Sequence, residues 1–235
     1  MLENIAGGPI HNGTRLLLLP DNTLLITTGD GGNSSLSQNM NSMSGKTLRM
    51  NLDGTIPTDN PDPMSYIWSS GHRNSQGLCN GPNGLIYSSE HGQQNSDEFN
   101  IIEKGRNYGW PNVEGACNTN SEMAFCNAFN VREPLTEYSP CIAVNGIEYY
   151  NHPAIPEFEN SVLMAVLGGI PTVAQRLTQL KMSDDGLSIV EQNNFLTNLG
   201  RLRDLCVNPH DGSIYVATNG SSYPGFGPNL SLIHI

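Results

Sequence analysis

The chain has 235 residues, a formal net charge of −11 and an isoelectric point near 4.8. This acidic balance disfavours binding to nucleic acid or to an anionic membrane surface, because both need clustered Lys and Arg side chains. No apolar run approaches the roughly 20 residues of a membrane-spanning helix, so we expect a soluble, loop-rich domain without a membrane span.

A strand–turn–strand pattern recurs along the chain. It reads PDN-TLLITTGD from Pro20, PNG-LIYSSEHG from Pro82 and PHDG-SIYVATNG from Pro209. The first interval is 62 residues and the second is 127, about twice as long, so a degenerate unit is expected between them, in NGIEYYNHPAIPEFENSVLMAVLGG from Asn145. Further strands are expected in TLRMNLDG from Thr47 and in QRLTQLKMSDDG from Gln175.

Several strands per unit at a long, fixed period are typical of radial repetition in a β-propeller. We therefore predict an all-β propeller, with a β-sandwich whose turns are similar by coincidence as the alternative. The chain would hold about three and a half blades, whereas a closed propeller has roughly four to eight. Residues 1–229 are therefore predicted to be a partial propeller, a fragment of about three to four blades, and residues 230–235 (LSLIHI), which continue no repeat, a non-native tail.

The five cysteines bear on whether the protein lies in an oxidising or a reducing compartment. Cys117 and Cys126 flank a polar loop, CNTNSEMAFC, in which a short-range disulfide is geometrically easy. Cys79, Cys141 and Cys206 lie in or beside expected strands, and at least two of them are expected to be small buried residues. No CxxC motif occurs, which leaves no basis for a zinc or thioredoxin-type site. We expect an oxidising setting, periplasmic or secreted.

Basic residues stand at equivalent places in the repeat. His11 and Arg73 each lie nine residues before the proline of their unit, and Arg201 and Arg203 lie at nearly the same place before Pro209. The inner strands of a propeller converge on its axis, so these side chains are expected to meet there. Three guanidinium groups without paired carboxylates favour an anionic ligand. The alternative is that each arginine pairs with a neighbouring carboxylate.

Acidic residues and turns follow the same strands. Asp30 comes ten residues after Pro20, where it could orient His11 as a general base. The turn GQQNSDEFN, residues 92–100, offers backbone carbonyls together with Asp97 and Glu98. Such an oxygen-rich, flexible turn suits Ca²⁺ better than a transition metal.

Five blocks of the sequence carry a family resemblance: IHNGTRLLLLPDNTLLITTGDGG, SGKTLRMNLDGTIPTDNP, IWSSGHRNSQGL, SSEHGQQNSDEFNIIEKGRNYGWP and GRLRDLCVNPHDGSIYVATNG. In this order they resemble the soluble quinoprotein glucose/sorbosone dehydrogenase family, which includes the aldose sugar dehydrogenases. The resemblance implies a six-bladed β-propeller that binds pyrroloquinoline quinone (PQQ) and Ca²⁺. It also implies oxidation of the C1 hydroxyl of aldoses, with a sugar substrate and an external electron acceptor as partners.

The resemblance implies a role for each matching residue. His11 would be the catalytic base, Asp30 the acid that orients it, and Arg73 with Asn74 the pair beside the quinone oxygens. The remaining matches are His91 and Asp97 near the cofactor, Gly92 and Gln93 at the cofactor calcium, Glu98 and Tyr108 at a second calcium, and Arg201 and Arg203 at the PQQ carboxylates.

The chain departs from the family at two positions. Gly168 stands where members carry a Lys beside the cofactor carboxylates, and Cys141 stands where they carry Ser or Thr. Loss of one cation would weaken cofactor binding by about 1.5–3 kcal/mol, the scale of a charge-assisted hydrogen bond. A non-catalytic propeller that binds a partner or a carbohydrate is therefore the alternative function.

Overall fold

The computed structural model describes residues 2–3, 5–168, 175–197, 199–219 and 232–234. Within them the chain forms four antiparallel sheets. The first contains β1 (Gly13–Leu18), β2 (Thr23–Thr28), β3 (Lys46–Asn51) and β4 (Ile67–Ser70), and the second contains β5 (Ser75–Asn80), β6 (Ile86–Glu90), β7 (Asp97–Ile101) and β8 (Thr136–Tyr138). The third contains β9 (Val144–Tyr150), β10 (Ser161–Val166), β11 (Arg176–Met182) and β12 (Ile189–Phe195), and the fourth β13 (Leu202–Val207), β14 (Ile214–Thr218) and β15 (Leu232–His234).

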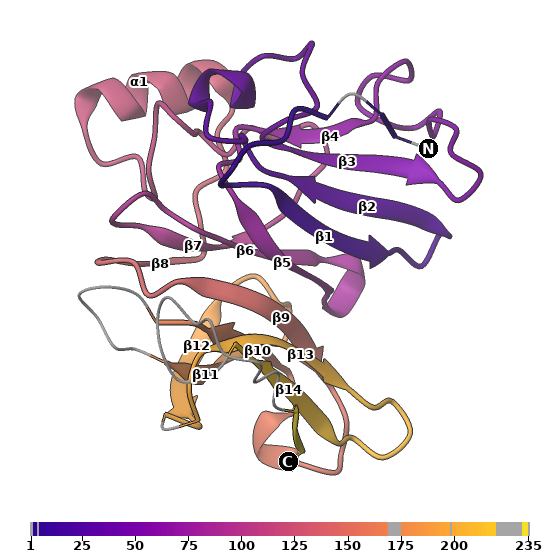
Figure 1. Ribbon diagram of the computed structural model, residues 1–235, viewed down its shortest axis with the longest axis vertical. Coiled ribbons are helices and arrows are strands. Elements are labelled where there is room, and N and C mark those ends of the chain that lie inside the picture. The colour runs from indigo at the N-terminus through magenta and orange to yellow at the C-terminus, as the bar shows by residue number, and fades with distance from the viewer. Residues whose placement is uncertain (1, 4, 169–174, 198, 220–231, 235) are drawn as a thin grey trace.

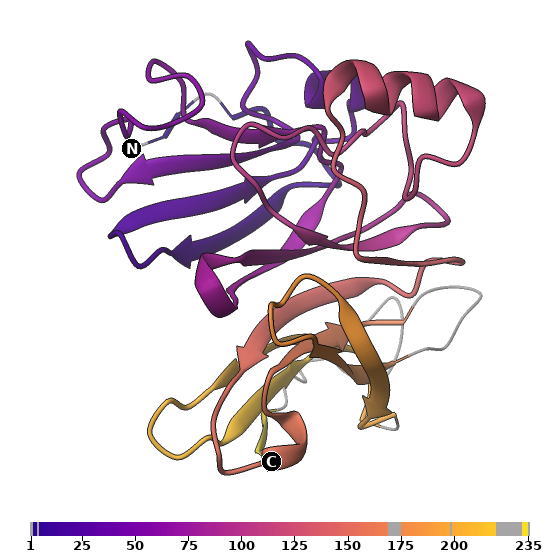
Figure 2. The ribbon, with the colours of Figure 1, turned by 180° about the vertical axis from the view of Figure 1, so that it is seen from behind.

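The sheets follow one another like the blades of a propeller. The first strands of successive sheets are neighbours, β1 beside β5, β5 beside β9 and β9 beside β13. Figures 1 and 2 show the sheets in this order, from indigo at one end of the molecule to yellow at the other. The predicted all-β propeller with three to four blades is confirmed, and the degenerate unit predicted from Asn145 is the third sheet.

The recurring turns share a left-handed backbone conformation. Asn22 and Asn83 adopt left-handed conformations, with φ of 63° and 55°, and Gly84 follows with φ of 77°. Asn and Gly tolerate this region better than other residues. The PNG turn is a short 3₁₀ segment, η2 (Pro82–Gly84), and two more such segments, η1 (Ser34–Ser37) and η3 (Pro156–Phe158), lie in other connections.

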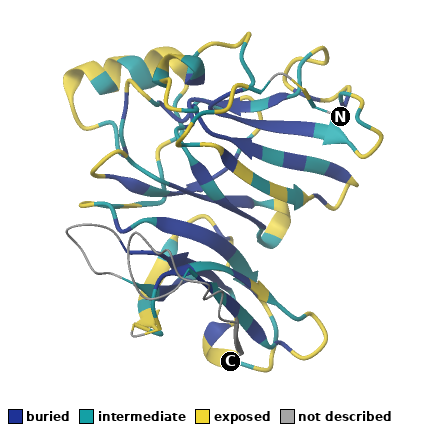
Figure 3. Ribbon diagram, viewed as in Figure 1, coloured by how far each residue is buried: buried dark blue, intermediate teal, exposed yellow. Residues whose placement is uncertain are grey.

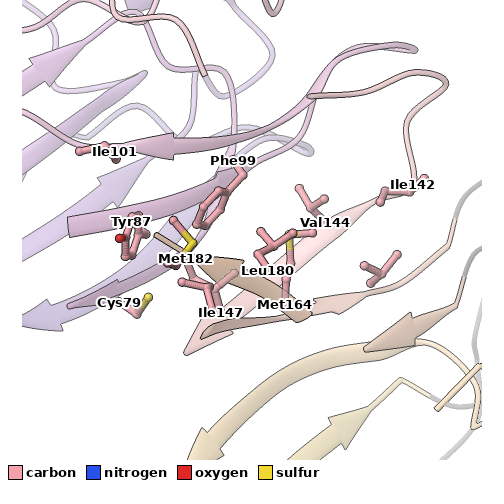
Figure 4. Packing of buried hydrophobic residues seen from close by; sticks show 12 residues of the cluster. Cys79, Tyr87, Phe99, Ile101, Ile142, Val144, Ile147, Met164, Leu180 and Met182 are labelled. Carbon is pink, nitrogen blue, oxygen red and sulfur yellow. The ribbon is translucent and has the colours of Figure 1, made fainter. Parts of the chain in front are cut away.

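Each pair of adjacent sheets shares a hydrophobic core. Figure 4 shows the core between the second and third sheets, where Tyr87 and Phe99 stack at 5.3 Å and Met164 and Leu180 are fully buried. Burying one such side chain contributes about 1.5–3 kcal/mol, so these cores fix the angle between neighbouring sheets.

The first sheet has an uncovered face. Leu16 and Leu18 on β1 are 60% and 53% exposed, and the exposed stretches of β1 are yellow in Figure 3. Exposed apolar strands promote association. We therefore predict that the isolated chain aggregates or depends on a partner.

The segment between β7 and β8 differs from expectation. The polar loop predicted around the disulfide contains a helix, α1 (Asn120–Phe129), none of whose residues is buried. A capping box explains it: Thr119 accepts from the backbone N–H of Glu122, and the Glu122 side chain accepts from the Thr119 N–H. The predicted Cys117–Cys126 disulfide is confirmed.

Two further expectations concern other parts of the chain. Among the remaining cysteines Cys79 is buried, Cys141 is partly buried and Cys206 is exposed, so only one fits the expectation of full burial. Within the predicted tail, β15 pairs with β14. The origin of residues 230–235 stays a prediction. In the part of the chain that the structure describes, no helix is long and apolar enough to cross a membrane.

Candidate functional site

His11 and Asp30 form a directed pair. His11 Nδ1 lies 2.8 Å from Asp30 Oδ1, and the carboxylate is almost fully buried. A carboxylate can only accept a hydrogen bond, so Nδ1 is the donor in this contact. An arginine can only donate, so the contact of Arg73 Nη2 with Nε2 makes Nε2 an acceptor. Asp30 also accepts from the Gly32 N–H (2.8 Å) and from Trp110 Nε1–H (2.9 Å), which leaves it little freedom to turn.

The local backbone explains where His11 sits. His11 is in the left-handed region, with φ of 53°, and its carbonyl accepts from the Gly31 N–H at 3.0 Å. A Cβ at Gly29 would lie 1.8 Å from that carbonyl oxygen. Only glycine allows such close packing of the two chain segments, so Gly29 helps to place His11 beside Asp30.

Arg73 meets the free nitrogen of this imidazole. One of its terminal nitrogens, Nη2, lies 3.0 Å from His11 Nε2, and the other, Nη1, donates to the His91 carbonyl at 3.1 Å. The guanidinium lies over the Trp110 ring, 5.3 Å from its centroid. Its Nε–H is buried and has no partner in the part of the chain that the structure describes.

The side-chain oxygen of Asn74, the next residue, is hydrogen-bonded within the protein. Its Oδ1 accepts from the Gly13 N–H at 3.1 Å and from Gln76 Nε2 at 2.8 Å. It therefore ties the start of β1 to the start of β5, and its carbonyl also accepts from the His91 N–H at 3.2 Å.

His91 carries a polar atom without a partner. Its Nε2 is buried and has no hydrogen-bond partner among the described residues. Burial lowers the pKa of His91, and the positive charges of Arg73 and Arg203 lower it further, against the opposing effect of Asp97. The imidazole of His91 is therefore neutral at pH 7. Arg73 and Arg203 both lie close enough to lower its pKa.

Arg203 in the fourth sheet affects His91 electrostatically, and Arg201 directly precedes the same strand, β13. Arg201 is buried and donates from Nη1 to the Gly168 carbonyl at 3.1 Å. With the Asn219 amide turned so that its oxygen faces Arg203, this oxygen accepts from Arg203 Nη2 at 2.7 Å and from Nε at 3.2 Å. Burial and the neighbouring charge of Arg201 lower the pKa of Arg203, although Asp204 opposes them.

Asp204 is committed to another arginine. Its Oδ2 accepts from Arg15 Nη1 at 2.6 Å, an ion pair between the first and fourth sheets. Arg15 Nε also donates to the Gln76 carbonyl at 3.0 Å. The alternative for Arg203 was an ion pair with its neighbour Asp204. That carboxylate is instead paired with Arg15.

Asp97 supports the backbone of the site. Its Oδ1 accepts from the Gly92 N–H at 2.9 Å, and its Oδ2 accepts from the N–H groups of Ile142 (2.8 Å), Ala143 (2.6 Å) and Val144 (3.3 Å). Both oxygens of this fully buried side chain are therefore used within the protein. Asp97 joins the second sheet to the start of the third.

The turn after β6 is lined by backbone oxygens. A Cβ at Gly92 would lie 2.0 Å from the Asn95 carbonyl oxygen and 2.6 Å from that of Ser96, so the turn closes only around a glycine. The next residue, Gln93, is exposed. Among the described residues there is no cluster of three His, Cys, Asp or Glu side chains suited to a metal. A cation here would therefore depend on carbonyl oxygens.

Glu98 and Tyr108 lie close to this turn. Glu98 accepts from the Gly115 N–H and from Asn100 Nδ2, both at 2.9 Å. Burial and the charge of Glu90 raise its pKa to about 8, a cost that a bound cation would relieve. The hydroxyl of Tyr108 is engaged, because it donates to the Ile101 carbonyl at 2.5 Å.

One cavity collects the core of the site. It has a volume of about 230 Å³ and is lined by His11, Asp30, Gly32, Ser34, Arg73, Gln93 and Trp110. Four predicted site residues thus meet there, namely His11, Asp30, Arg73 and Gln93. The other predicted residues are not among its lining residues: Asn74, His91, Gly92, Asp97, Glu98, Tyr108, Arg201 and Arg203. Trp110 was missed as a site residue. Its only signal was its place in the NYGWP block.

Fold and site together define a propeller with a His–Asp–Arg group at the junction of two blades. The model of the family described as Glucose / Sorbosone dehydrogenase matches residues 3–224, and the chain belongs to that family. An uncharacterized protein of Synechocystis sp. is 36% identical over 90% of this chain and 54% of its own length. The aldose sugar dehydrogenase YliI of Escherichia coli is 30% identical over 90% and 58%.

Solved structures agree with this assignment. The PQQ-bound form of the aldose sugar dehydrogenase from Streptomyces coelicolor has a TM-score of 0.81 and 32% identity, covering 98% of this chain and 63% of that one. The apo-form of the soluble aldose sugar dehydrogenase from Escherichia coli has a TM-score of 0.78 and 29% identity, covering 92% and 63%. The chain therefore spans between about half and two thirds of the length of these relatives.

Proposed function

We propose that the protein is a PQQ- and Ca²⁺-dependent sugar dehydrogenase that oxidises the C1 hydroxyl of an aldose to a lactone. The observation that supports this most is the cavity in which His11, oriented by Asp30, faces the guanidinium of Arg73. A base with a fixed tautomer beside a fixed cation is suited to removing a hydroxyl proton.

The residues present fit the cofactor. The buried Nε–H of Arg73 and the buried Nε2 of His91 both lack partners within the described ranges, so two polar atoms are available to a ligand with several oxygens. The carbonyl-lined turn at Gly92 and Gln93 would hold its Ca²⁺, and the cations Arg201 and Arg203 would hold its carboxylates. When bound, PQQ supplies the hydride acceptor and Ca²⁺ a Lewis acid that polarises it.

The protein's own residues would then act in a defined order. Arg73 Nη2 donates a hydrogen bond to the lone pair of His11 Nε2. The sugar hydroxyl therefore has to displace the guanidinium before it can reach Nε2. Nε2 then takes the hydroxyl proton, and Asp30 stabilises the imidazolium that forms. The displaced guanidinium can donate to an oxygen on which negative charge develops. An external acceptor would take the two electrons afterwards.

The two departures from the family have a structural setting. Gly168, in place of a Lys, offers its carbonyl to Arg201, so this arginine is fixed by the backbone of the segment that lacks the cation. Burial raises the pKa of the Cys141 thiol to about 12, with Asp97 adding to the effect, so this side chain is neutral. Both departures should weaken cofactor binding without removing the base.

Reconstitution tests the proposal. PQQ and CaCl₂ are added to the purified protein, PQQ binding is followed by absorbance, and dye reduction is followed with glucose and other aldoses. We expect reduction that needs both additions, and a His11→Gln variant that binds PQQ but does not turn over. His210→Gln is the matched control, because His210 is exposed on a turn of the fourth sheet. A quinone spectrum that no aldose changes would contradict the proposal.

A second function is favoured by Gly168 and Cys141. A propeller that kept the scaffold and lost the cofactor would bind a carbohydrate or a protein partner without redox chemistry. Calorimetry with the same aldoses in the absence of PQQ separates the two, since sugar binding together with failure to bind PQQ supports only this alternative.

We further propose a periplasmic or secreted location. The Cys117–Cys126 disulfide supports it, because such bonds persist in oxidising compartments. Assay of the culture medium and of the fraction released by osmotic shock would test it, since a protein that is released only by complete lysis would lie inside.

A further inference from the structure

Two buried ionisable residues of the site have no part in the chemistry proposed above. His72 precedes Arg73, and Glu90 precedes His91. His72 is fully buried and Glu90 is 4% exposed. A buried carboxylate is costly unless its oxygens are fully hydrogen-bonded, so the contacts of Glu90 indicate what it does.

Glu90 forms its hydrogen bonds with the segment that carries Arg73. Its Oε1 accepts from the backbone N–H groups of Arg73 and Asn74, the latter at 3.1 Å. Its Oε2 accepts from Ser75 Oγ at 2.7 Å and lies 2.8 Å from His72 Nδ1. One carboxylate on β6 thus binds four consecutive residues of the link between the first and second sheets.

His72 connects this carboxylate to the first sheet. Its Nε2 lies 2.8 Å from Ser69 Oγ on β4, and Ser69 Oγ lies 2.5 Å from Thr47 Oγ1 on β3. The imidazole is stacked on Tyr108, with ring centroids 4.5 Å apart. The chain of contacts therefore runs from β3 and β4, through His72, to Glu90 in the second sheet.

This network determines the relation between two blades at the site. His11 enters from the first sheet and Arg73 from the link to the second, yet their side chains meet at 3.0 Å. Among the described residues, the Arg73 side chain hydrogen-bonds to His11 and to the His91 carbonyl and lies over the Trp110 ring, and the start of this side chain is set by the Arg73 main chain. Among the described contacts, Glu90 accepts the Arg73 N–H directly.

We propose that Glu90 and His72 are positioning residues, which hold Arg73 against His11 through the main chain of residues 72–75 and transmit the placement of Ser69 to this contact. The inference rests on the proposed function only in naming His11 the base. The His11–Arg73 contact itself can be measured without PQQ or sugar, so failure of one claim is distinguishable from failure of the other.

Two spectroscopic signals report the contact. The ¹⁵N shift of His11 Nε2, assigned by its absence in His11→Asn, depends on the hydrogen bond from Arg73. The emission of Trp110 depends on the guanidinium over its ring and can be isolated in a Trp68→Phe background, because the chain has two tryptophans. Neither signal should respond to a general loss of stability.

Four variants make the test. Glu90→Leu removes every acceptor, so both signals should move to the values of an uncontacted His11 and Trp110. Glu90→Gln keeps a carbonyl oxygen for the two backbone N–H groups and should leave them in place. Ser69→Ala, a mild change on β4, should move both in the same direction by less. Leu163→Ala, which removes a fully buried side chain in the third sheet, is the matched control and should move neither.

The outcomes are decisive in both directions. Shifts in Glu90→Leu and Ser69→Ala, with retention in Glu90→Gln and Leu163→Ala, support the proposal. If Glu90→Leu fails to fold, Ser69→Ala alone decides. Folded Glu90→Leu or Ser69→Ala protein with both signals unchanged would overturn the proposal and leave the network as a structural element only.

Discussion

Asp97→Asn is the substitution for which the structure gives the clearest expectation. The Asp97 carboxylate is fully buried and accepts four backbone hydrogen bonds, one from Gly92 and three from residues 142–144. Asparagine has the same shape but only one acceptor oxygen. If that oxygen serves residues 142–144, the amide N–H₂ faces the Gly92 N–H, and two donors then oppose each other.

The cost follows from these contacts. A hydrogen bond to a charged group is worth about 1.5–3 kcal/mol, and a buried donor left without an acceptor costs about 1–3 kcal/mol. One bond of the first kind is lost and one donor of the second kind is created. The free energy of unfolding should therefore fall by roughly 3 kcal/mol, with the loss concentrated at the junction of the second and third sheets.

Urea denaturation followed by circular dichroism measures the free energy of unfolding, and hydrogen exchange at Ile142 and Ala143 locates the loss. Asp53→Asn is the control, because that carboxylate is exposed and binds only the backbone and side chain of Thr55. If Asp97→Asn is as stable as the parent to within about 0.5 kcal/mol, a difference typical of surface substitutions, the assigned role of Asp97 is wrong.

Three further predictions follow from single contacts. Asp30→Asn should lower aldose turnover by about 10⁴-fold, the scale found when a catalytic histidine loses its orienting carboxylate, and steady-state kinetics with unchanged PQQ binding would check it. Burial and the charge of Asp204 raise the pKa of Glu148 to about 7, although Arg15 opposes them. The folded state therefore favours protonated Glu148, and stability should fall as pH rises from about 4.5, the usual value for a free glutamate, to 7; Glu148→Gln should remove this dependence in urea titrations. Reduction of the disulfide should increase hydrogen exchange in α1 while the sheets keep their protection, because no residue of this helix is buried.

The sheets could be predicted from sequence because turn chemistry and strand patterns are local. Proline, asparagine and glycine mark the turns, and their spacing counts the blades. The His11–Asp30 pair could be predicted for the same reason, since both residues lie at strand ends of one unit. The helix α1 was missed because the segment around the disulfide was interpreted as a polar loop, although its apolar residues and the capping residues Thr119 and Glu122 were visible in the sequence.

Contacts that depend on the path of a loop could not be predicted. Trp110 binds Asp30 across 80 positions, and its approach is set by the connection between β7 and β8 rather than by the repeat. Asp97 was expected near a cofactor from the resemblance alone, whereas its hydrogen bonds to residues 142–144 depend on how two sheets meet. Periodicity places residues around an axis, but it does not say which oxygen accepts from which donor.

The ion pair between Arg15 and Asp204 has a consequence for the kinetics of folding. It joins residues 189 positions apart, and closing a flexible loop of that length directly would cost about 5 kcal/mol in chain entropy, more than such a contact returns. Sheets that assemble in sequence shorten the span that is still free at each step. The pair should therefore form late, and its appearance in a refolding experiment would time the arrival of the fourth sheet.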